Sequence, residues 1–69
     1  MPLSLAEIGK EYTIKRVAGN DEVRRHLEEM GFVPDGKVTM VQVIEGNVIV
    51  NVKNVRVAIS KQLAQKIYV

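Results

Sequence analysis

The fold is decided by residues 37–60, which read KVTMVQVIEGNVIVNVKNVRVAIS. Three runs rich in β-branched residues follow one another here, and the turn residues Gly46-Asn47 and Lys53-Asn54 separate them. The middle run, 47–53, alternates cleanly and places its three valines on one face. The first run, 37–45, is apolar on both faces, as in a strand that is covered on both sides or strongly bent. The sequence predicts three consecutive strands of a small curved sheet.

The third strand and the segment after it complete this half of the chain. Val55, Val57 and Ile59 are expected to face inward, with Arg56 outside. Ser60 is a predicted cap for a short helical turn over 62–65, in which Leu63 and Ala64 pack inward. Residues 67–69 are expected to form a closing strand.

The first part of the chain predicts one strand and one helix. Residues 12–17 read as a strand with imperfect alternation, which indicates a bulge or a bend. Before it, Ser4 to Glu7 has the form of a capping box and predicts a single helical turn that Gly9 ends. Residues 20–30 predict a helix, capped by Asn20 or Asp21 and carrying an apolar stripe of Val23, Leu27 and Met30.

The end of this helix predicts a defined stop and then a turn. Gly31 is expected to take the left-handed conformation and Phe32 to lie over Leu27. Pro34-Asp35-Gly36 has the composition of a tight turn. On the outer face of the helix, Arg24 with Glu28 and Arg25 with Glu29 have the spacing of ion pairs.

These elements predict the fold class. We expect a mostly β protein with a short α-helix, namely an SH3-like barrel of about five strands with the helix inserted after the first strand. Residues 1–69 are expected to form a single domain, because a chain of 69 residues has room for one core only.

Composition narrows the function classes. The chain has no cysteine, so disulfides and thiolate metal sites are excluded, and a reducing cytoplasm is the expected location. No stretch is apolar enough to enter a bilayer. Ten basic and eight acidic residues, with two tyrosines and one phenylalanine, form neither a basic block nor a stacking platform. Nucleic-acid binding is therefore not expected.

The residues for catalysis are nearly absent. The chain has one histidine and two serines, and the serines are better explained as helix caps. Glu28 and Glu29 are neighbours on a helix and point about 100° apart, so they cannot act as a carboxylate pair. We expect no enzyme activity.

The predicted helix offers weak metal ligands. Glu22, His26 and Glu29 fall on one side of it, and an imidazole between carboxylates can hold a divalent transition metal weakly. The alternative is a histidine at the edge of the core that pairs with one of the two carboxylates. We expect no tightly bound cofactor and no complete metal site.

A protein-binding surface is the third candidate. Arg24, Arg25 and Glu28 form a mixed-charge helix face, with the apolar residues Phe32 and Val33 beside it, and binding surfaces commonly combine these features. The alternative is that the charges are only solvated and the apolar residues belong to the core.

The sequence also resembles a known family along its whole length. Residues 23–36, VRRHLEEMGFVPDG, resemble the arginine-leucine and leucine/methionine-glycine-aromatic/leucine-x-proline-glycine signature of FeoA domains. The opening 5–9 is similar to their Leu-x-x-Leu/Ile-x-x-Gly start with shortened spacing, and 57–69 is similar to their alanine- and isoleucine-containing close. Two features depart from the pattern: Asp35 separates Pro34 from the loop glycine, and His26 stands where members often have arginine.

The resemblance implies an SH3-like barrel and a role in ferrous iron uptake. FeoA proteins are thought to act beside FeoB, a membrane transporter with a cytosolic GTP-binding domain, so Arg24, Arg25, Glu28, Phe32 and Val33 become the expected contact face. The family is also described as binding transition metals, and its domain occurs at the C-terminus of diphtheria-toxin-repressor-type regulators. A metal-binding or metal-sensing module is therefore the alternative function. A start at Met1 without an upstream DNA-binding segment favours a free-standing protein, and weak self-association stays open.

Overall fold

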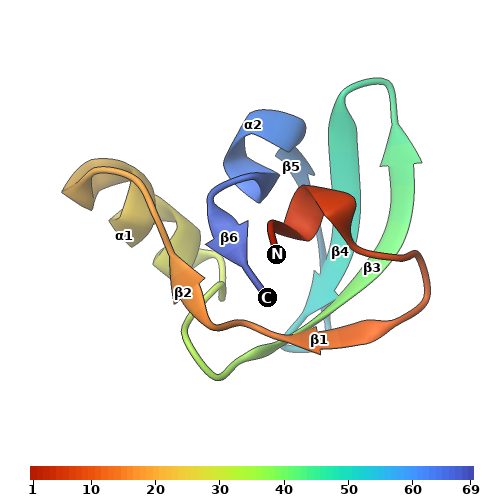
Figure 1. Cartoon of the computed structure of the whole chain (residues 1–69), viewed down its shortest axis with the longest axis horizontal. Helices are drawn as coiled ribbons and strands as arrows, with labels where there is room; N and C mark the ends of the chain where they lie inside the picture. Colours follow the sequence, from red (N-terminus) through yellow and green to blue (C-terminus); the bar gives the residue numbers. More distant parts are fainter.

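A computed structural model describes residues 1–69 and contains six strands and three short helices. They follow in the order η1 (Leu3–Leu5), β1 (Glu11–Thr13), β2 (Arg16–Val17), α1 (Asp21–Glu29), β3 (Lys37–Ile44), β4 (Asn47–Val52), β5 (Val55–Ser60), α2 (Lys61–Ala64) and β6 (Ile67–Tyr68) (Figure 1). The strands form an antiparallel sheet β1-β3-β4-β5 and a second pair β2-β6. This confirms the predicted mostly β fold with a helix near the first strand.

Two tight hairpins join β3, β4 and β5. Glu45 and Gly46 have φ values of 37° and 82°, and Lys53 and Asn54 have 51° and 64°. Two successive left-handed residues are typical of the two-residue turn whose twist matches that of the flanking strands. The second turn lies where the sequence predicts it, whereas the first lies one residue earlier, because Asn47 already pairs with Ile44.

Strand β3 is bent, as its two-sided apolar pattern predicts. Its register against β4 shifts between Met40 and Gln42, so Val41 has no partner residue. Such a bulge increases the local twist and turns the strand. Val38 and Met40 before the bulge are buried, whereas Val43 and Ile44 beyond it are each 43% exposed.

The expected first strand is divided between the two sheets. Glu11 to Thr13 pair with β3, and Arg16 and Val17 pair with β6. Between them lies Ile14, which is completely buried. The predicted bend is therefore the point at which the chain passes from one sheet to the other, around a core side chain.

One cluster of fourteen buried apolar residues forms the core. It receives Leu3 from η1, Leu27 from α1, Phe32 from the following loop and the valines of β4, all at most 1% exposed. No buried side-chain polar atom lacks a hydrogen-bond partner. None of the helices has the length and apolar character required to cross a membrane.

Helix α1 has both predicted ends. The side chain of Asn20 accepts a 2.8 Å hydrogen bond from the backbone N–H of Val23. At the other end Gly31 has φ 104°, its N–H donates to the carbonyl of Glu28 at 2.9 Å, and the N–H of Phe32 donates to that of Leu27 at 3.0 Å. This pair of bonds is the Schellman stop, which fixes Phe32 next to Leu27.

The turn after α1 is closed by a 3.0 Å hydrogen bond from the N–H of Gly36 to the carbonyl of Val33. Asp35 occupies its left-handed position with φ 70°. A Cβ on Gly36 would lie 3.0 Å from the carbonyl oxygen of Val33. The predicted turn is confirmed, and its glycine is needed for close backbone approach while Asp35 takes the strained conformation.

Four local predictions are wrong: one helix cap, two ion pairs and one inward-facing residue. Ser4 caps nothing, because η1 begins at the buried Leu3 and places Ser4 inside the turn. The ion pairs Arg24–Glu28 and Arg25–Glu29 are absent, since Arg24 instead reaches Asp21 in the first turn. Val55, expected inside, is 57% exposed because β5 has no neighbouring strand beyond it. The caps of α1 and α2, by contrast, are confirmed, since Ser60 accepts a bond from the N–H of Leu63 at 3.2 Å.

Candidate functional site

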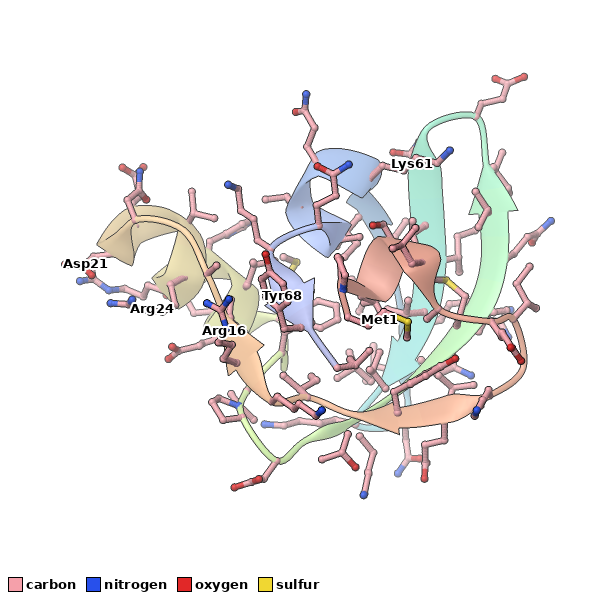
Figure 2. All side chains as sticks on the ribbon, in the orientation of Figure 1. Met1, Arg16, Asp21, Arg24, Lys61 and Tyr68 are labelled. Carbon is pink, nitrogen blue, oxygen red and sulfur yellow. The ribbon has the colours of Figure 1, made fainter.

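The outer face of α1 forms the first candidate surface. Val23 and Leu27 turn toward the core, so the residues between them face solvent. Asp21, Arg24, Arg25 and Glu28 line a shallow depression of about 250 Å³. Figure 2 shows Asp21 and Arg24 at the end of α1 that lies farthest from the large sheet. The structure thus brings together the three charged residues that the sequence predicts for a contact face.

Charge pairing within this face is incomplete. Arg24 and Asp21 form the one salt bridge of the structure, between side chains that are 45% and 82% exposed. An exposed pair of this kind contributes about 0–1 kcal/mol. Arg25 and Glu28 have no ion-pair partner, so both remain available to a partner protein.

The apolar part of the predicted contact face is smaller than expected. Phe32 is completely buried and belongs to the core, because the helix stop holds it against Leu27. It cannot touch a partner in this fold, and its inclusion in the contact face is wrong. Val33 is half-buried and Pro34 is exposed. The surface beside the charges therefore consists of these two residues.

The predicted metal ligands lie on the neighbouring flank of α1. Glu22, His26 and Glu29 line a second shallow depression of about 250 Å³, together with Arg25. The positive guanidinium of Arg25 lies among the same residues and opposes the binding of a metal cation there. No group of three or more His, Cys, Asp or Glu residues in the structure is arranged to hold a metal ion. His26 also makes no salt bridge with either carboxylate.

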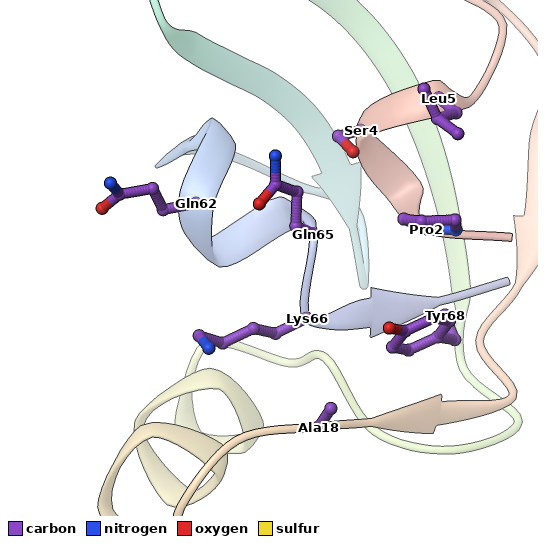
Figure 3. A pocket seen from close by; sticks show the side chains of 8 residues that line it. All are labelled: Pro2, Ser4, Leu5, Ala18, Gln62, Gln65, Lys66 and Tyr68. Atoms are coloured by element: carbon purple, nitrogen blue, oxygen red, sulfur yellow. The ribbon is translucent and has the colours of Figure 1, made fainter.

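The largest depression, of about 490 Å³, lies elsewhere, between the two ends of the chain. Its lining residues lie in or directly next to η1, α2 and β6 and in the segment after β2, namely Pro2, Ser4, Leu5, Ala18, Gln62, Gln65, Lys66 and Tyr68 (Figure 3). The ends meet because Pro2 pairs with Tyr68 and the N–H of Val69 donates to the carbonyl of Met1 at 2.8 Å. No short-range sequence pattern links these residues, so sequence reasoning missed the groove.

The groove has a simple chemical character. Lys66 is its only charged lining residue, and its other polar groups are amides and hydroxyls. Beside it the guanidinium of Arg16 lies 4.1 Å from the centre of the Tyr68 ring, within cation–π distance. Ser4 makes no side-chain hydrogen bond, Ser60 is engaged as a cap, and His26 lies in a depression on α1 that neither serine lines. No nucleophile and base are placed together.

Comparison with known proteins gives a consistent result. A family model described as FeoA domain matches residues 1–69. An iron uptake regulatory protein (FeoA) is 28% identical with a TM-score of 0.90, over 97% of this chain and 91% of that chain. FeoA of Stenotrophomonas maltophilia complexed with zinc, described as a prokaryotic SH3 domain protein and a candidate ferrous iron transport activating factor, is 29% identical with a TM-score of 0.83, over 97% and 86%.

The same fold occurs in a larger regulator. A manganese-dependent transcriptional repressor is 19% identical with a TM-score of 0.88, over 100% of this chain and 40% of that chain, so it shares the fold alone. The predicted SH3-like architecture is confirmed by these neighbours. No curated protein sequence matches the chain.

Proposed function

The chain belongs to the FeoA family, and on that premise we propose that it is a non-enzymatic, cytosolic accessory protein of ferrous iron uptake. It docks onto the cytosolic GTP-binding part of an FeoB-type transporter and modulates it. The absence of a nucleophile–base pair supports a role through binding, in which the protein biases the conformation or assembly of its partner.

The observation that carries the docking proposal is the outer face of α1. Arg25 and Glu28 are exposed, lie in one depression and lack ion-pair partners. Their helix is fixed by a cap at each end and by two buried side chains, Leu27 and Phe32. Rigid presentation lowers the entropy that a contact surface loses on binding.

Both signs of charge on this face define what it recognises. A mixed-charge surface fits a partner surface that also carries both signs, and it gives specificity and orientation more than affinity. Since the attractions are short-range, salt should weaken the complex only mildly. Val33 and Pro34 supply the adjacent apolar contact.

The test is a calorimetric titration of the transporter's soluble cytosolic domain, with and without GTP. The double variant Arg25→Ala/Glu28→Ala should bind about tenfold more weakly than wild type. A matched control, Glu11→Ala/Lys15→Ala, removes one acid and one base that are also exposed but lie within β1 and directly after it. Equal weakening by both pairs, or by neither, would exclude α1 as the docking face.

A second function is metal binding or sensing, favoured by the zinc complex of the Stenotrophomonas maltophilia protein. In this chain Glu22, His26 and Glu29 would supply the ligands, with weak affinity because Arg25 shares their depression. Calorimetry with ferrous, manganous and zinc ions on wild type and His26→Ala tests it. Identical curves for the two proteins dismiss this function.

A further inference from the structure

Strand β5 is the open edge of the large sheet. The strand order is β1-β3-β4-β5, and β5 pairs with β4 alone over all six of its residues. In Figure 1 it lies at the back of the view, beside β4 and α2, which are the elements packed against it. Its other edge faces no strand, so the backbone groups directed there have no partner in the sheet.

The hairpin geometry identifies these groups. The two-residue turn at Lys53-Asn54 joins Val52 and Val55, which form the first hydrogen-bonded pair of such a hairpin. Hydrogen-bonded pairs alternate along an antiparallel ladder, so Arg56 and Ala58 direct their N–H and C=O groups away from β4. Neither residue makes a turn or loop backbone bond, and both are exposed. The backbone N–H and C=O groups of Arg56 and of Ala58 are therefore free to pair with another strand.

The edge carries little protection against pairing. Proteins usually blunt an open edge with proline, a bulge, inward-pointing charge or charged side chains along the edge, and of these β5 has only Arg56. Strand β5 contains no proline, and its register against β4 is continuous. Its inward residues are apolar, and Val55 leaves 57% of its surface exposed while Val57 is half-buried. An added strand could cover both valines.

Charge indicates what kind of strand fits. Residues 46–69 contain four basic residues and no acidic one, so all eight acids of the chain lie before them. Of these basic residues, Lys53 lies in the turn before β5, Arg56 lies within the strand and Lys61 follows it directly. A second copy of the chain would bring the same basic residues to the contact. An acidic segment is complementary to them.

We propose that the free edge of β5 binds an extended acidic segment of a partner protein by strand addition. The segment pairs with the backbone of Arg56 and Ala58, places β-branched residues beside Val55 and Val57, and directs carboxylates to the face of Arg56. This site is separate from the α1 face, and it does not depend on docking to the transporter.

The test is an NMR titration with the blocked peptide acetyl-TEVEVEVT-amide, with acetyl-TKVKVKVT-amide as control. The acidic peptide should shift the amide signals of Arg56 and Ala58 and slow their hydrogen exchange at least tenfold. Arg56→Glu should raise the dissociation constant about tenfold. Arg25→Glu, the same charge change on α1, should leave it unchanged. Ala58→Pro, which removes an edge donor, should abolish the protection.

Four outcomes would overturn the proposal. The shifts could map to α1 or to the groove of Figure 3 instead of β5. The lysine peptide could bind as well as the acidic one. Arg25→Glu could weaken binding as much as Arg56→Glu, which would mean that only net charge matters. Finally, Arg56 and Ala58 could already be protected without peptide in a concentration-dependent way, which would make a second copy the occupant.

Discussion

Helix α1 and strand β5 present two different kinds of surface. The outer face of α1 offers side chains of both charges, and these side chains, not free backbone edges, are what a partner would meet there. The edge of β5 offers backbone groups, and the charged residues within the strand and next to it in sequence are all basic. The first can recognise a shaped, mixed-charge surface, whereas the second can recognise an extended chain. The two proposed contact surfaces therefore share no residues.

Removing the buried side chain of Phe32, which follows α1, should have the largest effect on the stability of the protein. Phe32→Ala should lower the free energy of unfolding by about 3–5 kcal/mol, because it leaves a cavity between α1 and the sheet. A domain of this size has a total stability of roughly 3–10 kcal/mol, so a substantial unfolded fraction is expected. Urea unfolding followed by circular dichroism measures it. Val33→Ala, next to it but half-buried, is the control, and an equal loss in both would contradict the assignment of Phe32 to the core.

The N-terminal cap of α1 should have the next largest effect. Asn20→Ala removes the acceptor for the N–H of Val23 and should cost about 1 kcal/mol. Ser4→Ala is the matched control, since Ser4 makes no capping bond and its loss should change stability by less than about 0.5 kcal/mol. Thermal unfolding of both variants compares them. A larger loss for Ser4→Ala would restore the capping box that the structure lacks.

Two substitutions in the turn after α1 should have smaller effects on stability, and these effects should be opposite in sign. Asp35→Gly should stabilise the protein by about 0.5 kcal/mol, since Asp35 holds a left-handed φ of 70° that glycine adopts without strain. Gly36→Ala should destabilise it, because the new Cβ meets the carbonyl of Val33 at 3.0 Å. Denaturant midpoints of the two variants should move in opposite directions. A shift of both midpoints in the same direction would contradict the left-handed Asp35 and the close backbone approach at Gly36.

The smallest effect should come from the ion pair of α1. Arg24→Ala should change stability by less than about 0.5 kcal/mol, because both partners are exposed. Its influence should also vanish in about 1 M salt, where exposed charges are screened. Urea unfolding of wild type and Arg24→Ala at low and at high salt measures the difference in the free energy of unfolding. A loss above about 1 kcal/mol would mean that Asp21 and Arg24 help to hold the helix ends.

The sequence predicts those elements whose signals are local. The valines of β4 alternate without exception, Asn20 and Ser60 have capping partners three residues away, and Gly31 follows the apolar C-cap residue of α1. Each of these depends on neighbours within a few residues, so pattern alone identifies it. The mostly β class follows from the same signals.

Features that depend on distant parts of the chain could not be predicted. Ile14 divides the first strand because two sheets meet around it, and the groove exists because Pro2 reaches Tyr68. Phe32 could be placed in the core or on the surface until the bonds of the helix stop fixed it. The acid-free stretch 46–69 is visible in the sequence, but its meaning required the strand order that leaves β5 at an edge.

The most direct test of the account is a binding comparison of two single charge reversals. Arg25→Glu and Arg56→Glu are titrated separately against the transporter's cytosolic domain, with wild type as the reference and unfolding curves as the check on folding. With α1 as the docking face, Arg25→Glu should weaken binding about tenfold while Arg56→Glu leaves it unchanged. Weakening by Arg56→Glu with no effect of Arg25→Glu would contradict α1 as the docking face.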